Sequence, residues 1–81
     1  QTEGAARNLA LVLQAAGSSI ERILQLRVYV RGEIGEHLET VAPILVRHFG
    51  VTRPALTGIG VASLASSDTL VEIEAVAKLV R

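Results

Sequence analysis

The last third of the chain alternates between apolar and polar residues, and this pattern constrains the fold more than any other feature. LVEIEAVA, at Leu70–Ala77, has the period of two that is typical of a β-strand with one buried face. RPALTGIGVASL, at Arg53–Leu64, is also strand-like, and a polar loop separates the two segments. We predict strands near 55–63 and 70–80. The buried face of the last strand is predicted to carry Val71, Ile73, Ala75, Ala77 and Leu79, and its other face Glu72, Glu74, Val76, Lys78 and Val80.

Two glycines interrupt the first of these strands. Gly58 and Gly60 fall on the same face, where a glycine weakens a strand and has no side chain to pack. Their presence indicates that another backbone or a ligand approaches closely at this face.

Two helices are predicted from apolar stripes with helical spacing. The first covers 2–16, with Thr2 as its N-cap and Gly17 as its C-cap. The second covers 35–49, where Pro43 conflicts with an unbroken helix. Either that helix kinks at Pro43, or it begins near Thr40 so that the proline lies in its first turn. The stripes are Ala5, Leu9, Val12, Leu13 and Ala16 in the first helix, and Ile34, Leu38, Val41, Leu45 and His48 or Phe49 in the second.

A third strand is predicted between the helices, ending at Arg31-Gly32. Its two faces alternate, with Leu24, Leu26, Val28 and Val30 on one and Gln25, Arg27, Tyr29 and Arg31 on the other. The order is therefore helix, strand, helix, strand, strand. This order predicts an α+β fold in which two helices pack on one face of a three-stranded sheet.

The composition limits the class of protein. A chain of 81 residues makes one domain, which we place at 1–81. Its apolar content of 49% exceeds what a domain of this size buries easily, so we expect self-association. Zero net charge and few aromatic residues argue against nucleic-acid binding, and no apolar run is long enough to span a membrane. A cytoplasmic location is expected, since no signal peptide is visible.

The residues that suggest metal or cofactor binding do so weakly. The chain has no cysteine, and His37 and His48 lack the spacing of metal ligands, so surface or interface roles suit them better. Gly58-Ile59-Gly60 lacks the third glycine and the following helix of a dinucleotide-binding loop. We expect no metal and no cofactor.

Several segments together resemble the RidA (YjgF) family of enamine/imine deaminases, also labelled endoribonuclease L-PSP. The resemblance runs over nearly the whole chain. It rests on the order and spacing of QTEGAARNL, AAGSS, LQLRVYV, VRHFG, RPALTGIGVASL and LVEIEAVA.

The resemblance implies a chorismate-mutase-like fold that assembles as a homotrimer, with a small-metabolite cleft between subunits. It also implies an N-terminal β-hairpin that would precede Gln1. Family members hydrolyse 2-enamine and 2-imine acids to 2-keto acids and ammonia. An arginine holds the substrate carboxylate, and a glutamate on the last strand helps to activate water.

Carried over to this chain, the resemblance makes Glu72 the candidate catalytic residue and Leu56, Thr57 and Gly58 the candidate ligand-binding residues. Leu56 replaces the carboxylate-binding arginine, since the chain has Pro-Ala-Leu where the family usually has Pro-Ala-Arg. Leucine offers no hydrogen-bond donor to a carboxylate.

Three functions follow as hypotheses. The first is a divergent trimeric protein that binds a small metabolite and is impaired in ordinary imine deamination. The second is an active enamine/imine deaminase that uses Glu72. The third, from the older family label, is an endoribonuclease that inhibits translation, against which the neutral charge weighs.

Overall fold

The computed structural model of the chain describes residues 1–50 and 54–79, in the predicted order of elements. The helices are α1 (Thr2–Ala15) and α2 (Ile34–Phe49), and a short 3-10 turn, η1 (Ile20–Arg22), precedes the first strand. The strands are β1 (Ile23–Arg31), β2 (Ala55–Val61) and β3 (Val71–Ala77). Val80, the last residue of the predicted strand 70–80, and Arg53, which precedes the predicted strand 55–63, lie outside the described residues.

The three strands form one mixed sheet in the order β2-β1-β3. β1 pairs in parallel with β2, placing Leu26 opposite Leu56, and antiparallel with β3, placing Tyr29 opposite Glu72. β1 is thus the central strand, although it comes first in the chain. The parallel pair is possible because α2 supplies the long connection that such strands require.

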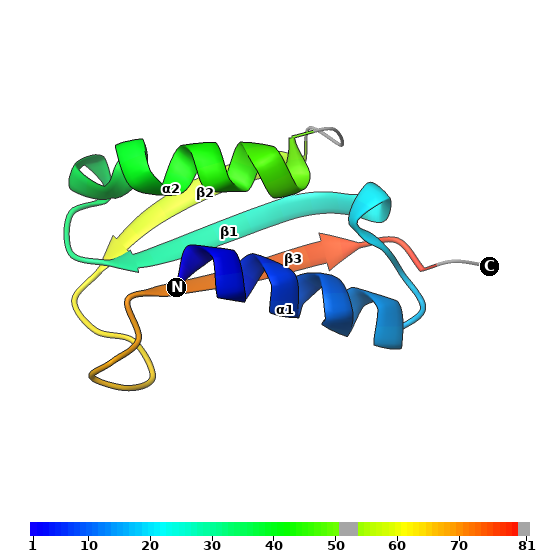
Figure 1. Cartoon of the computed structure of the whole chain (residues 1–81), viewed down its shortest axis with the longest axis horizontal. Helices are drawn as coiled ribbons and strands as arrows, with labels where there is room; N and C mark the ends of the chain where they lie inside the picture. The colour runs from blue at the N-terminus through cyan, green and yellow to red at the C-terminus, as the bar shows by residue number, and fades with distance from the viewer. Residues whose placement is uncertain (51–53, 80–81) are drawn as a thin grey trace.

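Both helices lie on the same side of the sheet (Figure 1). α1 packs mainly over β3, and α2 packs over β1 and β2. The core between the layers is made of Ala6, Leu13, Ile23, Leu26, Val28, Val30, Val41, Leu45, Phe49 and Val71. No described helix covers the other face of the sheet. The α+β architecture predicted from the pattern is therefore confirmed. Neither described helix is long and apolar enough to cross a membrane.

A β-bulge changes which residue of β1 is buried at the start of the strand. The pairing with β3 shifts register between Ile23 and Gln25, so that Leu24 is 50% exposed and Ile23 is buried. The prediction that Leu24 shares the buried face of Leu26 was wrong for this reason. An extra residue in one strand reverses, on one side of the bulge, which residues of that strand face the core.

The end of α1 shows a clear sequence signal. Gly17 has a positive φ of 84°, its N–H donates to the Gln14 carbonyl, and the N–H of Ser18 donates to Leu13. In this Schellman arrangement Ala16 is the C-cap and Gly17 is the residue after it, one position later than the predicted role as C-cap. The start was mispredicted. Gln1 is the N-cap, while Thr2 is the first helical residue and is buried.

Three stripe positions were also mispredicted, and one of them, Ala16, is exposed after the end of α1. Val12 is 62% exposed and Leu38 is 49% exposed, while Ala6 is fully buried. Each helix meets the sheet on a face somewhat rotated from the predicted one. Small residues such as Ala6 allow the close approach of α1 to the sheet.

α2 continues through Pro43 without ending. The alternative in which the helix begins near Thr40 is therefore wrong, because the helix already begins at Ile34. Pro43 is exposed, so its ring faces solvent and the missing N–H affects only the local backbone hydrogen bonding.

The close approach predicted at the glycines of β2 is confirmed. A Cβ atom on Gly60 would lie 2.3 Å from the Gly32 carbonyl oxygen, and one on Gly58 would lie 3.3 Å from the Ile34 side chain. The strand ends differ slightly from prediction. β2 ends at Val61, and β3 ends at Ala77, so that Leu79 follows the strand and is 62% exposed.

Candidate functional site

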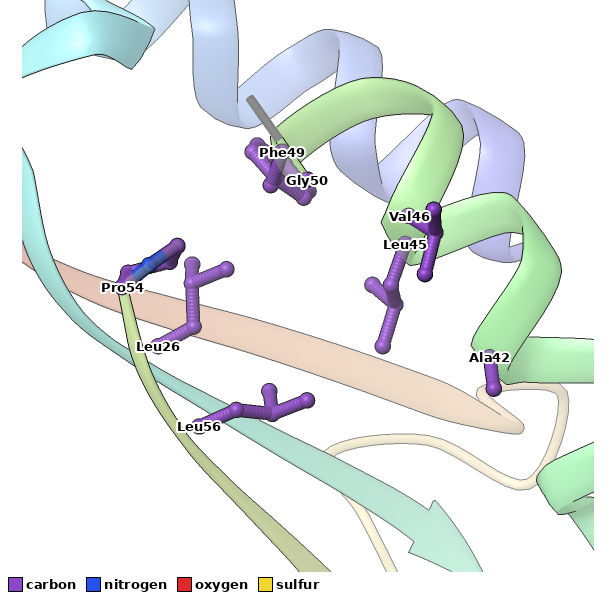
Figure 2. A pocket seen from close by; sticks show the side chains of 8 residues that line it. All are labelled: Leu26, Ala42, Leu45, Val46, Phe49, Gly50, Pro54 and Leu56. Carbon is purple, nitrogen blue, oxygen red and sulfur yellow. The ribbon is translucent and has the colours of Figure 1, made fainter. Parts of the chain in front are cut away.

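A groove opens between α2 and the β2 side of the sheet (Figure 2). It has a volume of about 220 Å³ and is lined by Leu26, Ala42, Leu45, Val46, Phe49, Gly50, Pro54 and Leu56. In Figure 2 the α2 residues face Leu26, Pro54 and Leu56 across an open space. None of these side chains is charged or carries a hydrogen-bonding group. The groove therefore offers a small molecule an apolar surface.

Leu56 reaches this groove because of the register of β2. It pairs with Leu26, whose side chain is buried beneath the helices, so both side chains lie on the helix-covered face. Leu56 is 57% exposed, as expected for a residue in the wall of an open groove.

The other two predicted ligand-binding residues lie on different faces of β2. Gly58 follows Leu56 on the helix-covered face, where it leaves room for Ile34. Thr57 lies on the uncovered face, where it pairs with Arg27 of the central strand. The three predicted residues thus do not line one surface of a single chain.

Glu72 lies on the uncovered face of β3, opposite Tyr29. Its Oε1 atom accepts a hydrogen bond of 3.3 Å from the backbone N–H of Ala65, in the loop that precedes β3. Leu56 and Glu72 are therefore on opposite faces of the sheet and on its two outer strands. Within one chain they do not share a cavity.

The uncovered face carries a polar cluster that we define as Arg27, Tyr29 and Glu74. The Tyr29 hydroxyl donates to Glu74 Oε1 at 2.7 Å, and Arg27 Nη1 donates to the same oxygen at 3.2 Å. Both hydrogen bonds lower the pKa of the Glu74 carboxyl from its ordinary value of 4.5, and the bond from Tyr29 has the larger effect. The bond to Glu74 raises the pKa of Tyr29 and of Arg27. The cluster therefore keeps Glu74 ionised to a lower pH than an isolated glutamate.

Part of this cluster was foreseen. The alternation of the last strand placed Glu74 on its polar face, where it forms an ion pair with Arg27. The alternation of β1 also placed Arg27 and Tyr29 together on a polar face. Their pairing with β3 was not predicted, because the register between two strands that are far apart in sequence cannot be derived from either strand alone.

The two histidines have separate surroundings. His48 is largely buried, and its Nε2 atom lies 3.0 Å from Oε2 of Glu3. Arg47 forms an ion pair with the same Glu3 carboxylate. These contacts connect the end of α2 to the start of α1. His37 lies near Gly32. Within residues 1–50 and 54–79, no group of three or more histidine, cysteine, aspartate or glutamate side chains is arranged to hold a metal ion.

Comparison with known proteins adds the following similarities. A sequence model described as Endoribonuclease L-PSP matches residues 1–79. A RutC family protein of Pyrococcus horikoshii is 30% identical over 77 residues, which is 95% of this chain and 59% of that protein.

Two solved structures are similar throughout the described fold. YyfB of Yersinia pestis, a protein of unknown function of the conserved Rid family, has a TM-score of 0.84 and 36% identity, covering 98% of this chain and 60% of that one. A YjgF/YER057c/UK114 family member of Mycobacterium tuberculosis has a TM-score of 0.84 and 33% identity, covering 93% and 62%. The chain thus spans about three fifths of the length of these relatives.

Proposed function

The chain belongs to the Endoribonuclease L-PSP family, which includes the RidA/YjgF proteins, and from this premise we propose that it is a divergent member impaired in ordinary imine deamination. In the proposal, it assembles as a homotrimer and binds a small metabolite in a cleft between subunits. One observation carries the proposal. Leu56, at the position of the carboxylate-binding arginine expected from the family resemblance, lies in a wholly apolar groove.

The electrostatics of the groove support impaired binding of carboxylate substrates. A buried carboxylate needs charged or hydrogen-bonding partners, and an apolar wall supplies neither. The cation of the polar cluster does not replace the arginine, because Arg27 is already paired with Glu74. Hydrogen bonds to a charged group contribute about 1.5–3 kcal/mol each, so losing an arginine fork removes most of the affinity for a 2-imine acid.

The separation of Leu56 and Glu72 supports a site shared between subunits. Because they lie on opposite faces of one sheet, a ligand could touch both positions only if they came from neighbouring copies. The polar and apolar side chains on the uncovered face, including Ile59 and Val76, would then meet a partner.

Hydrolysis of an imine generated in situ tests the proposal. An amino-acid oxidase supplies the 2-imine acid, and trapping with semicarbazide reports how much remains. We expect the full chain to hydrolyse it far more slowly than a family member that has arginine at the position of Leu56. Equal rates would establish the alternative, an active deaminase that relies on Glu72.

The Leu56→Arg variant tests whether one residue accounts for the impairment. We expect imine hydrolysis to rise by about tenfold or more, because a planar fork with paired donors is restored. Leu56→Lys is the matched control, since it adds the charge without the fork and should recover less. A Glu72→Gln change in the Leu56→Arg background should abolish the gain. If Leu56→Arg brings no gain, the loss of the arginine does not explain the impairment.

A further inference from the structure

The chemistry of the groove between α2 and β2 defines the ligand more narrowly than the family resemblance does. We propose that this groove selects small uncharged molecules, with an aliphatic or aromatic body, and discriminates against carboxylates of the same shape. The inference rests on the proposed function, because it places the metabolite against Leu56, and it names the chemical class of that ligand.

The wall of the groove has no charged or polar side chain. All eight residues that line it are apolar or glycine, and they come from three elements and the adjoining backbone (Figure 2). An uncharged body gains from leaving water for such a wall, while an ionised carboxylate loses its hydration and receives no partner. The wall therefore separates the two classes by charge.

Arg47 and Arg31 have partners outside the groove. Arg47 is adjacent to Val46 in the sequence, but its side chain pairs with Glu3 of α1. Arg31 donates to the Thr69 carbonyl, in the loop before β3. None of the arginines or lysines that the structure describes lines the groove. Arg47 and Arg31, both among the described residues, are thus engaged in contacts that hold the fold together.

The groove is large enough for a small ring-containing molecule. Its volume of about 220 Å³ exceeds the roughly 150 Å³ of an apolar cavity that accepts benzene. A six-membered ring with one small substituent fits this space. Val46 and Leu56 are 66% and 57% exposed, so the groove opens to solvent and a ligand can enter without unfolding α2.

A pair of ligands that differ in charge but not in shape tests the inference. We expect cyclohexanecarboxamide to bind the full chain about tenfold or more tightly than cyclohexanecarboxylate at pH 7, measured by calorimetry and by NMR shifts of the groove residues. Equal binding, a preference for the carboxylate, or no binding of the amide would overturn the inference.

Three variants locate the binding. Leu56→Arg should reverse the preference, and Val46→Asp should weaken the amide without unfolding the chain, since Val46 is exposed on α2. Leu11→Asp, at an exposed position of α1 outside the groove, is the matched control and should leave binding unchanged. If Leu11→Asp weakens the amide as much as Val46→Asp does, the groove is not the binding site and the inference falls.

The result is independent of the imine assay. A chain that hydrolyses the 2-imine acid slowly but binds neither ligand retains the proposed impairment and loses the inference. A chain that hydrolyses it at ordinary rates and still prefers the amide retains the inference and loses the impairment. If Val46→Asp and Leu56→Arg instead dissociate an oligomer, as sedimentation would show, and neither ligand shifts the groove resonances, a second copy occupies the groove and the inference is wrong.

Discussion

At the scale of single residues, Glu74 shows how one carboxylate organises the uncovered face of the sheet. Its Oε1 atom accepts from both Tyr29 and Arg27, although all three side chains are accessible to solvent. Such bonds favour the ionised carboxylate in the folded state, while the unfolded chain keeps an ordinary carboxyl pKa.

This difference predicts a pH dependence of stability. The folded-state pKa of Glu74 is depressed, so the stabilisation is present above 4.5 and is lost as the pH falls through the lower folded value. We expect the difference in unfolding free energy between the wild type and Glu74→Gln to shrink below pH 4.5 in urea titrations. In Tyr29→Phe, NMR titration should find the Glu74 pKa closer to its ordinary value. An unchanged value would mean that the tyrosine bond has no influence.

Gly60 provides a prediction with an internal control. In Gly60→Ala the new Cβ would lie 2.3 Å from the Gly32 carbonyl, so the backbone must move, and we expect a loss of about 1–3 kcal/mol of unfolding free energy. Gly4→Ala meets nothing within 4 Å in the helix α1 and should stabilise the protein by roughly 0.5–1 kcal/mol. Denaturant unfolding of both variants measures the contrast. Equal effects of the two would contradict the close packing of β2 on the turn before α2.

At the scale of elements, α2 keeps its length despite an unfavourable residue. Val41, Leu45 and Phe49 bury one face of the helix on the sheet, and this burial outweighs the local disruption at Pro43. The sequence left a choice between a kink and a late start, because local propensity does not include the energy of packing.

Pro43→Ala should therefore stabilise the protein. The change restores a backbone N–H and removes the clash within the helix, which together cost up to about 3 kcal/mol, less the entropy that proline removes from the unfolded chain. Thermal unfolding should show a higher Tm. Ala42→Ser, at the neighbouring exposed position, is a control that should change Tm little. A lower Tm for Pro43→Ala would mean that α2 needs the proline for its shape.

At the scale of the whole molecule, both α-helices within residues 1–50 and 54–79 lie on one side of the sheet (Figure 1), and the other side mixes charges with apolar residues. Val76 of β3 is 57% exposed there, and Ile59 is half-buried on the same face, on the other outer strand, β2. An apolar surface of this kind commonly marks an interface.

Sedimentation tests the proposed assembly. We expect the full chain to sediment as an oligomer and Val76→Arg, on the uncovered face, to shift it towards monomer, because a charge would be buried without a partner. Leu11→Arg, at a similarly exposed site on α1, should leave the distribution unchanged. A stable wild-type monomer would contradict the proposal of a site between subunits.

Local pattern determines much of this protein. The order of helices and strands, the polar face of β1, the end of α1 at Gly17 and the close approach at Gly60 all follow from periodicity and from the conformational needs of glycine. These properties depend on neighbouring residues, so they can be read along the chain. The family could be identified from the sequence for the same reason, since its motifs keep their order and spacing.

Only the tertiary structure decides how the strands pair and which faces meet the helices. The bulge at Leu24 moved burial to Ile23, the register joined Glu74 to Tyr29 and Arg27, and α2 closed an apolar groove over Leu56. The tertiary structure also placed Leu56 and Glu72 on opposite faces of the sheet, although both come from the alternating last third of the chain. Each of these outcomes depends on contacts between segments distant in sequence, whose relative position is set by packing of the whole chain.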